Sequence, residues 1–111
     1  MNIAQRCSVA PAHDMPMFPD NEFDFVMCCD VMEHVPESYV ERTLKEIYRV
    51  GSDKFMFAIA IATASSVGGT VQTHCTVAPP DWWEKQVANA GFKIVHCQIE
   101  EDHHVVFGCV K

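Results

Sequence analysis

The chain has 111 residues and a formal net charge of −7, from 15 acidic and 8 basic side chains. Its length fits one domain with a single core. Lys and Arg form no cluster in the sequence, which disfavours a nucleic acid or an anionic membrane as partner, because neutralising phosphates needs concentrated positive charge. We therefore expect the partner to be a small molecule or another protein.

The longest apolar stretch, KFMFAIAIATA, is too short to cross a bilayer, and the N-terminus lacks the basic and apolar blocks of a signal peptide. We therefore expect no membrane association and a cytoplasmic location. Six cysteines would favour disulfides in a small secreted chain, but four of them lie within apolar strand patterns, where free Cys packs as a small hydrophobe. No CxxC pair occurs, so a structural zinc site is not expected.

The first elements along the chain are a loop-rich segment and a strand. Residues 1–22 contain three prolines and little periodicity, which predicts loops with a short extended piece around residues 8–10. Residues 23–29, FDFVMCC, form an apolar run with one charge. Such a run is typical of a parallel strand that is covered on both faces.

A helix is predicted next, between Pro36, which suits a first helical turn, and Gly51, which can end it. Its apolar stripe, which would lie on the sheet, consists of Val40, Leu44, Ile47 and Tyr48. A second strand follows, over about residues 54–62. Residues 63–78, which contain a Gly-Gly pair, then predict a loop over the strand ends.

The last third of the chain predicts a helix and a hairpin. Pro79 opens the helix, and Gly91 is typical of its C-terminal cap. One face of this helix is apolar and carries Trp83, Val87 and Ala90. Two strands, over about residues 92–99 and 103–110, are joined by the acidic turn EED and therefore predict an antiparallel pair.

This order of elements, together with three local signatures, resembles the C-terminal two-thirds of a class I S-adenosylmethionine-dependent methyltransferase. The signatures are MFPDNEFDFVMCCDVMEHV, LKEIYRV and WWEKQVANAGFKIV. The resemblance implies an α/β fold with a truncated Rossmann-like methyltransferase sheet, mostly parallel with a C-terminal antiparallel hairpin. It implies one truncated methyltransferase-like domain over residues 1–111, with a loop-rich segment at 1–22 and an α/β core at 23–111.

The resemblance also implies S-adenosylmethionine as cofactor. Ligands of open parallel sheets bind beyond the carboxyl ends of the strands, which here means Cys29, Asp30 and Val31. Asp30 has a second interpretation, as a cap of the turn after the strand. The loop that packs on the adenine in the family corresponds by position to Ala12, His13 and Asp14. The family's adenine-binding acid falls on Pro11 in one alignment and on Asp14 in a shifted one.

Two cofactor contacts of the family have no clear counterpart. The chain lacks the Gly-rich turn that binds the methionine part of the cofactor in the family. Asn2 stands where the family has the acid that binds the ribose hydroxyls, and Asn makes such a bond without the charge that strengthens it. The resemblance therefore supports the fold more directly than the activity.

Glu33 and His34 are the candidate catalytic residues, because an imidazole beside a cofactor pocket is suited to proton transfer. The alternative is that both residues organise the start of the following helix. His74 either reaches the substrate or lies solvated in its loop. No metal site is expected, because the histidines considered for one are scattered along the sequence: His13, His34, His74, His103 and His104.

We therefore expect a methyltransferase-like domain whose ancestral activity transfers a methyl group from S-adenosylmethionine to a small molecule, with an activity that the missing contacts weaken or abolish. The alternatives are a non-catalytic binding or assembly module that uses the C-terminal half of the fold, and an incomplete reading frame. In the family, the first strand of the sheet pairs with the strand that corresponds to residues 23–29, and this chain has no counterpart of it. Residues 1–22 would be a poor substitute strand, because their prolines lack the amide hydrogen that strand pairing needs. We therefore predict a homodimer that covers the open edge.

Overall fold

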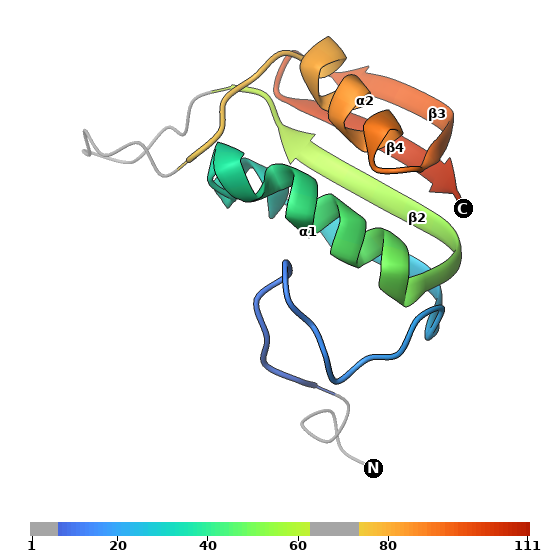
Figure 1. The fold of residues 1–111 in the computed structure, drawn as a ribbon. Coiled ribbons are helices and arrows are strands. Elements are labelled where there is room, and N and C mark those ends of the chain that lie inside the picture. Colours follow the sequence, from blue (N-terminus) through green and yellow to red (C-terminus); the bar gives the residue numbers. More distant parts are fainter. Residues whose placement is uncertain (1–6, 63–73) are drawn as a thin grey trace.

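The computed structural model describes residues 7–62 and 74–111. They form a four-stranded sheet with two long helices, α1 and α2, on the same face (Figure 1). The elements are β1 (Phe23–Cys29), the short 3₁₀ helix η2 (Met32–His34), α1 (Glu37–Val50), β2 (Gly51–Ala60), α2 (Pro80–Asn89), β3 (Lys93–Glu100) and β4 (His104–Val110). No helix of this part of the chain is long and apolar enough to cross a membrane.

The strands lie in the order β1-β2-β4-β3. β1 and β2 are parallel, whereas β4 is antiparallel to both β2 and β3. This is the mixed sheet of a truncated Rossmann-like methyltransferase fold with a C-terminal hairpin, as the sequence predicts. β1 lies at one edge of the sheet, and in residues 7–62 and 74–111 no strand pairs with its outer side.

The predicted ends of both helices are confirmed. Pro36 immediately precedes α1, and Gly51 ends it and at once begins β2. A Cβ atom at Gly51 would overlap the buried Phe55 ring, so the packing of this ring favours glycine here, although the extended backbone at φ −94° suits any residue. Gly91 follows α2 with φ of 112°, a left-handed conformation that favours glycine as a helix C-cap.

The core lies between the sheet and the helices. Alternate residues of β2 and β4 point to the helices, so Phe57, Val105 and Phe107 are fully buried against Trp83 of α2. Leu44 covers the same face from α1. The opposite face of the sheet carries no helix of the described residues, which leaves large apolar side chains exposed there: Phe25, Met27 and Val95.

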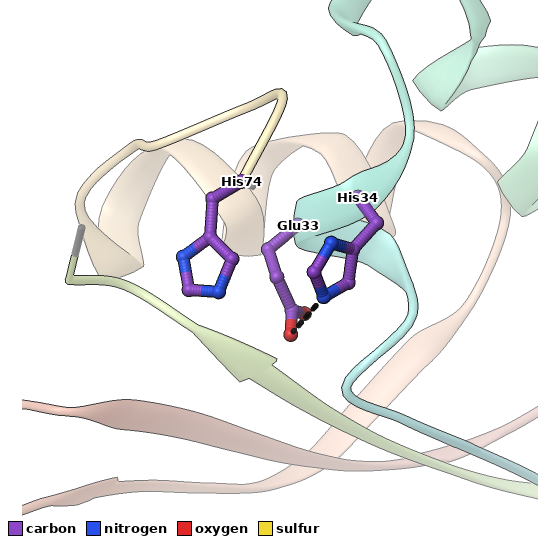
Figure 2. A group of neighbouring side chains, drawn as sticks. All are labelled: Glu33, His34 and His74. Carbon is purple, nitrogen blue, oxygen red and sulfur yellow. Dashed lines mark ion pairs between the residues drawn. The ribbon is translucent and has the colours of Figure 1, made fainter. Parts of the chain in front are cut away.

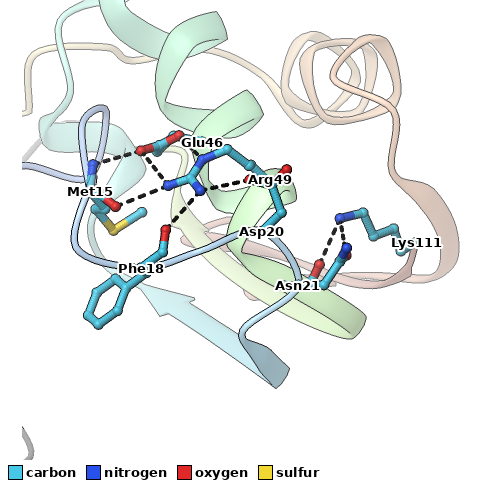
Figure 3. Close-up of polar contacts among 8 residues, drawn as sticks. Met15, Phe18, Asp20, Asn21, Glu46, Arg49 and Lys111 are labelled. Atoms are coloured by element: carbon cyan, nitrogen blue, oxygen red, sulfur yellow. Dashed lines mark hydrogen bonds and ion pairs between the residues drawn. The ribbon is translucent and has the colours of Figure 1, made fainter.

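The N-terminal segment, residues 7–22, lies along α1 and forms no strand, so the extended piece expected around residues 8–10 pairs with no strand. Two charged side chains of α1 bind this segment (Figure 3). Glu46 Oε2 accepts the main-chain N–H of Met15 at 2.7 Å. Arg49 donates to the Met15 carbonyl at 3.0 Å and to the Asp20 carboxylate at 2.9 Å. These bonds hold the segment beside α1, where the Phe18 ring packs on Phe23 of β1 without adding a strand to the open edge.

Five cysteines form no disulfide: Cys28, Cys29, Cys75, Cys97 and Cys109. Burial, together with the nearby Cys29 and Glu33, raises the pKa of the Cys28 thiol to about 12. Burial raises the pKa of Cys109 to about 11. At neutral pH both thiols are therefore uncharged core groups, as predicted for free Cys in apolar strands.

Candidate functional site

β1 ends in a corner that Asp30 forms. Asp30 adopts φ of 56°, a left-handed conformation that Asp tolerates better than most residues, and its N–H donates to the Ala58 carbonyl at 2.9 Å. Its carboxylate lies 2.8 Å from Nε2 of His104. Asp30 thus links the carboxyl end of β1 to the start of β4, across β2.

Glu33 lies just beyond this corner and is only 1% exposed. Its Oε1 accepts the N–H of Ala60, at the end of β2, at 3.3 Å. Its main-chain carbonyl accepts the N–H of Thr76 at 3.0 Å, and the Thr76 hydroxyl donates to the Val35 carbonyl at 2.7 Å. Glu33 therefore lies where η2, the end of β2 and the segment before α2 meet.

Two imidazoles lie on either side of the Glu33 side chain (Figure 2). Nε2 of His34 is 3.8 Å from Oε2 of Glu33, and the His34 and His74 rings are nearly perpendicular with centroids 5.0 Å apart. One ligand atom from each residue lies within 4.8 Å of the others. His74 reaches this place because its segment follows β2, whose carboxyl end lies at the same edge of the sheet as that of β1.

An apolar hollow of about 400 Å³ lies between the N-terminal segment, α1 and the open edge of β1. Its lining is Ala12, Met15, Phe18, Phe23, Val26, Met27, Cys28, Cys29, Val31, Ile47 and Val50. Three of the cofactor residues predicted from the sequence are thereby brought together: Ala12, Cys29 and Val31. Two of them, Cys29 and Val31, lie at the carboxyl end of β1, next to Glu33 and His34.

The two remaining residues of the predicted adenine loop lie elsewhere. His13 and Asp14 line a different hollow, of about 580 Å³, along a mostly charged face of α1. The His13 ring packs on Tyr39 with ring centroids 4.9 Å apart. The structure thus separates these two residues from the three that line the apolar hollow.

The apolar hollow fits the adenine end of S-adenosylmethionine. Apolar side chains and the thiols of Cys28 and Cys29 suit a flat aromatic ring. The ribose hydroxyls and the charged methionine end need polar or charged partners, and the hollow's described lining has no charged side chain. Asn2, expected at the position of the ribose acid, and the loop predicted at residues 63–73 lie outside the described residues.

A family described as methyltransferase domain matches residues 2–58 of the chain. No curated protein sequence matches the chain. Solved structures do, and one is the PH0226 protein of Pyrococcus horikoshii, with a TM-score of 0.74 and 15% identity over 93% of this chain and 57% of that chain.

Two other matching structures are methyltransferases with S-adenosylhomocysteine bound. Magnesium protoporphyrin IX methyltransferase of Synechocystis has a TM-score of 0.65 and 12% identity over 92% of this chain and 49% of that chain. The 1,6-didemethyltoxoflavin-N1-methyltransferase of Burkholderia thailandensis also contains 1,6-didemethyltoxoflavin. It has a TM-score of 0.68 and 15% identity over 92% of this chain and 48% of that chain. At these identities the likeness shows the fold, and the chain spans about half the length of these proteins.

Proposed function

Because the chain belongs to the methyltransferase domain family, within the class I S-adenosylmethionine-dependent methyltransferases, we propose that it transfers a methyl group from S-adenosylmethionine to a small-molecule acceptor. One observation carries this proposal. The apolar hollow runs along the open side of β1, and its end at Cys29 and Val31 lies near the Glu33-His34 pair, at the edge of the sheet that the carboxyl ends of β1 and β2 form. This edge is where ligands bind in open α/β sheets.

In this proposal the adenine lies in the apolar hollow against Ala12, Cys29 and Val31. Asp30 contributes from the corner, at the border between the cofactor and the acceptor. His13 and Asp14 belong to the same N-terminal segment as Ala12, so they reach the cofactor only if this segment turns about Ala12 on binding. When bound, S-adenosylmethionine supplies a methyl group activated by the sulfonium charge.

Glu33 and His34 are proposed to act on the acceptor. The His34 side chain is 46% exposed, and its Nε2 lies 3.8 Å from the buried Glu33 carboxylate. The negative charge behind the ring would orient it and stabilise the imidazolium that forms when His34 accepts a proton from a hydroxyl or amine. The further role of the chain's own residues is to bring acceptor and methyl group together and to exclude water.

We expect residues 1–111 by themselves to bind the cofactor weakly, because they contain no Gly-rich turn and have Asn2 at the position of the ribose-binding acid. Charge-assisted contacts are worth about 1.5 to 3 kcal/mol each. A second subunit that supplied such groups would restore them. Homodimer formation, a cytoplasmic location, and the absence of nucleic-acid and membrane partners remain predictions from the sequence.

A second candidate function is a non-catalytic binding or assembly module that uses this half of the fold. The exposed apolar sheet face and the open edge of β1 favour this alternative. Large apolar groups on a sheet face are normally covered by helices or by a partner. Such a module would need the surface of the sheet and no cofactor.

Mapping of amide chemical shifts in ¹⁵N-labelled protein on addition of S-adenosylhomocysteine tests the proposal. We expect the largest shifts at Ala12, Cys29 and Val31, with little change at the far end of the sheet, for example at Lys93. Shifts confined to other surfaces would contradict the proposed cofactor position. An unchanged spectrum at millimolar ligand would favour the assembly module.

A further inference from the structure

The geometry points to a metal site that the methyl-transfer proposal does not include: we propose that Glu33, His34 and His74 bind a divalent transition-metal ion, with Zn²⁺ as the best match. Two imidazole nitrogens and one carboxylate oxygen suit Zn²⁺ and its first-row neighbours. Mg²⁺ and Ca²⁺ prefer oxygen ligands alone. The three side chains come from two segments, η2 and the stretch before α2, that the fold brings together (Figure 2).

The distances need only a small contraction. The three candidate ligand atoms lie within 4.8 Å of one another, and Nε2 of His34 is 3.8 Å from Oε2 of Glu33. With Zn–N and Zn–O distances of about 2.0–2.2 Å, tetrahedral ligand atoms are roughly 3.3–3.5 Å apart. Rotations of the His34 side chain, which is 46% exposed, and of His74, which is half-buried, can close this gap.

The surrounding main chain orients two of the three ligands. The carbonyl of Ala62 lies 2.8 Å from Nδ1 of His74, so a proton on Nδ1 leaves Nε2 as the metal-binding nitrogen. The N–H of Ala60 donates to Oε1 of Glu33 at 3.3 Å, which leaves Oε2 on the side of His34. Such second contacts to main-chain groups are typical of metal ligands in proteins.

The charge of Glu33 favours a cation at this place. A buried carboxylate is costly unless a cation or several hydrogen-bond donors compensate it. Glu33 is 1% exposed, and within residues 7–62 and 74–111 its carboxylate accepts a hydrogen bond from the neutral main-chain amide of Ala60. A divalent ion between Glu33 and the two imidazoles would compensate the carboxylate directly.

Three protein ligands leave at least one coordination position for water or for an oxygen of the acceptor, as in catalytic zinc sites. A hydroxyl bound there would lose its proton more readily because the metal lowers its pKa. His34 cannot bind a metal through Nε2 and accept a proton there at the same time. The metal and the His34 base are therefore alternative ways to activate an acceptor at the same edge of the sheet.

Titration of the chelator-treated full chain with Zn²⁺, followed by calorimetry, tests the site without any cofactor. We expect one ion per chain and a dissociation constant at least tenfold higher for His74→Ala and for His34→Ala. His103→Ala is the matched control, because His103 lies exposed in the β3-β4 turn. Cys75→Ser controls for the exposed thiol beside His74. Both controls should bind as the wild type does.

Co²⁺ as a spectroscopic substitute gives a second readout. The wild type should show the visible absorption of Co²⁺ bound to nitrogen, and His74→Ala should lose it while its far-UV circular dichroism is unchanged. Failure to bind Zn²⁺ would overturn the proposal, as would equal affinity in His74→Ala and the wild type, or an equal loss in His103→Ala. Because no S-adenosyl compound is present, failure of the methyl-transfer proposal does not alter these outcomes.

Discussion

Asp30 has an unusual backbone conformation and contacts two neighbouring strands, so its role can be tested by two different substitutions. We expect Asp30→Ala to weaken binding of S-adenosylhomocysteine several-fold, because the carboxylate would no longer lie at the border of the cofactor site. Loss of its pair with His104 should cost little stability, since the Asp30 side chain is 64% exposed and exposed pairs contribute about 0 to 1 kcal/mol. Calorimetric titration measures the affinity of each variant.

Asp30→Asn is the matched control for the backbone. Asn tolerates the left-handed φ of 56° as Asp does, whereas Ala is strained there. Asn should therefore keep the corner and lose only the charge. Wild-type affinity in both variants would remove Asp30 from the cofactor site and leave it as a cap of the turn.

Single residues were predictable where one local rule determines their place. Trp83 was expected in the core from the apolar face of its helix, and it is fully buried. The contact of His34 with His74 was not predictable from spacing, because it depends on two strands ending at the same edge of the sheet. The pair of Asp30 and His104 depends in the same way on β4 lying beside β2.

At the scale of elements, the N-terminal segment and α1 are held together by Glu46 and Arg49. The hydrogen bond from Arg49 lowers the pKa of Glu46 below its ordinary value of 4.5, and the N–H of Met15 lowers it further. A carboxyl with a lowered folded-state pKa stabilises the fold fully above its unfolded value, and this stability is lost as the pH falls through the lowered value. We therefore expect the melting temperature to decrease as the pH is lowered below about 4.5.

Glu46→Gln should reduce this dependence on pH and lower the melting temperature by several degrees at pH 7, because an amide replaces the carboxylate that binds Arg49. The control is Glu41→Gln, since the Glu41 side chain is 72% exposed and its pair with Lys45 is screened by water. Thermal unfolding of both variants at neutral and acidic pH provides the measurement. Equal profiles for Glu46→Gln and the wild type would contradict a role of Glu46 in binding the segment.

The types of the elements were more predictable than their bounds. Proline and glycine predicted the ends of both helices: Gly91 acts through its left-handed backbone, whereas Gly51 leaves room for the Phe55 ring. β2 was expected over about residues 54–62, yet it begins at Gly51 and ends at Ala60. Pairing with the neighbouring strands decides the bounds: Gly51 pairs with Phe23, and Ala60 pairs with His104.

At the scale of the whole molecule, residues 7–62 and 74–111 leave one face of the sheet and the edge of β1 uncovered. Phe25 is 51% exposed, Met27 61% and Val95 67%. An open edge beside an apolar face favours pairing with another chain. We therefore expect a homodimer, measured by light scattering on the eluting protein as twice the monomer mass of 12.5 kDa.

Met27→Lys should shift the eluting species to the monomer, because it places a charge on the apolar face beside the edge. Val77→Lys is the control, since Val77 is similarly exposed but lies in the segment before α2. A wild-type monomer at tens of micromolar would contradict the dimer.

The fold of the whole chain was predictable because the order of strands and helices, the helix ends and the hairpin each have a local signature. The positions of the residues predicted to bind the cofactor were less predictable from the sequence. Ala12, Cys29 and Val31 meet at one hollow, whereas His13 and Asp14 lie along α1 because Glu46 and Arg49 bind their segment there. Bonds between distant residues decide this, and no local pattern in the sequence encodes them.

The central claim is that this half of the methyltransferase fold binds the S-adenosyl group through its adenine end. Calorimetric titration with S-adenosylhomocysteine and, separately, with adenosine tests it most directly. We expect saturable binding of one ligand per chain with a dissociation constant in the range of about 10 to 1,000 μM, or roughly −7 to −4 kcal/mol. Adenosine should bind within about tenfold of this value, because residues 1–111 contain no Gly-rich turn to bind the methionine end, and each charge-assisted contact is worth about 1.5 to 3 kcal/mol. No heat of binding from either ligand at millimolar concentration would contradict the claim.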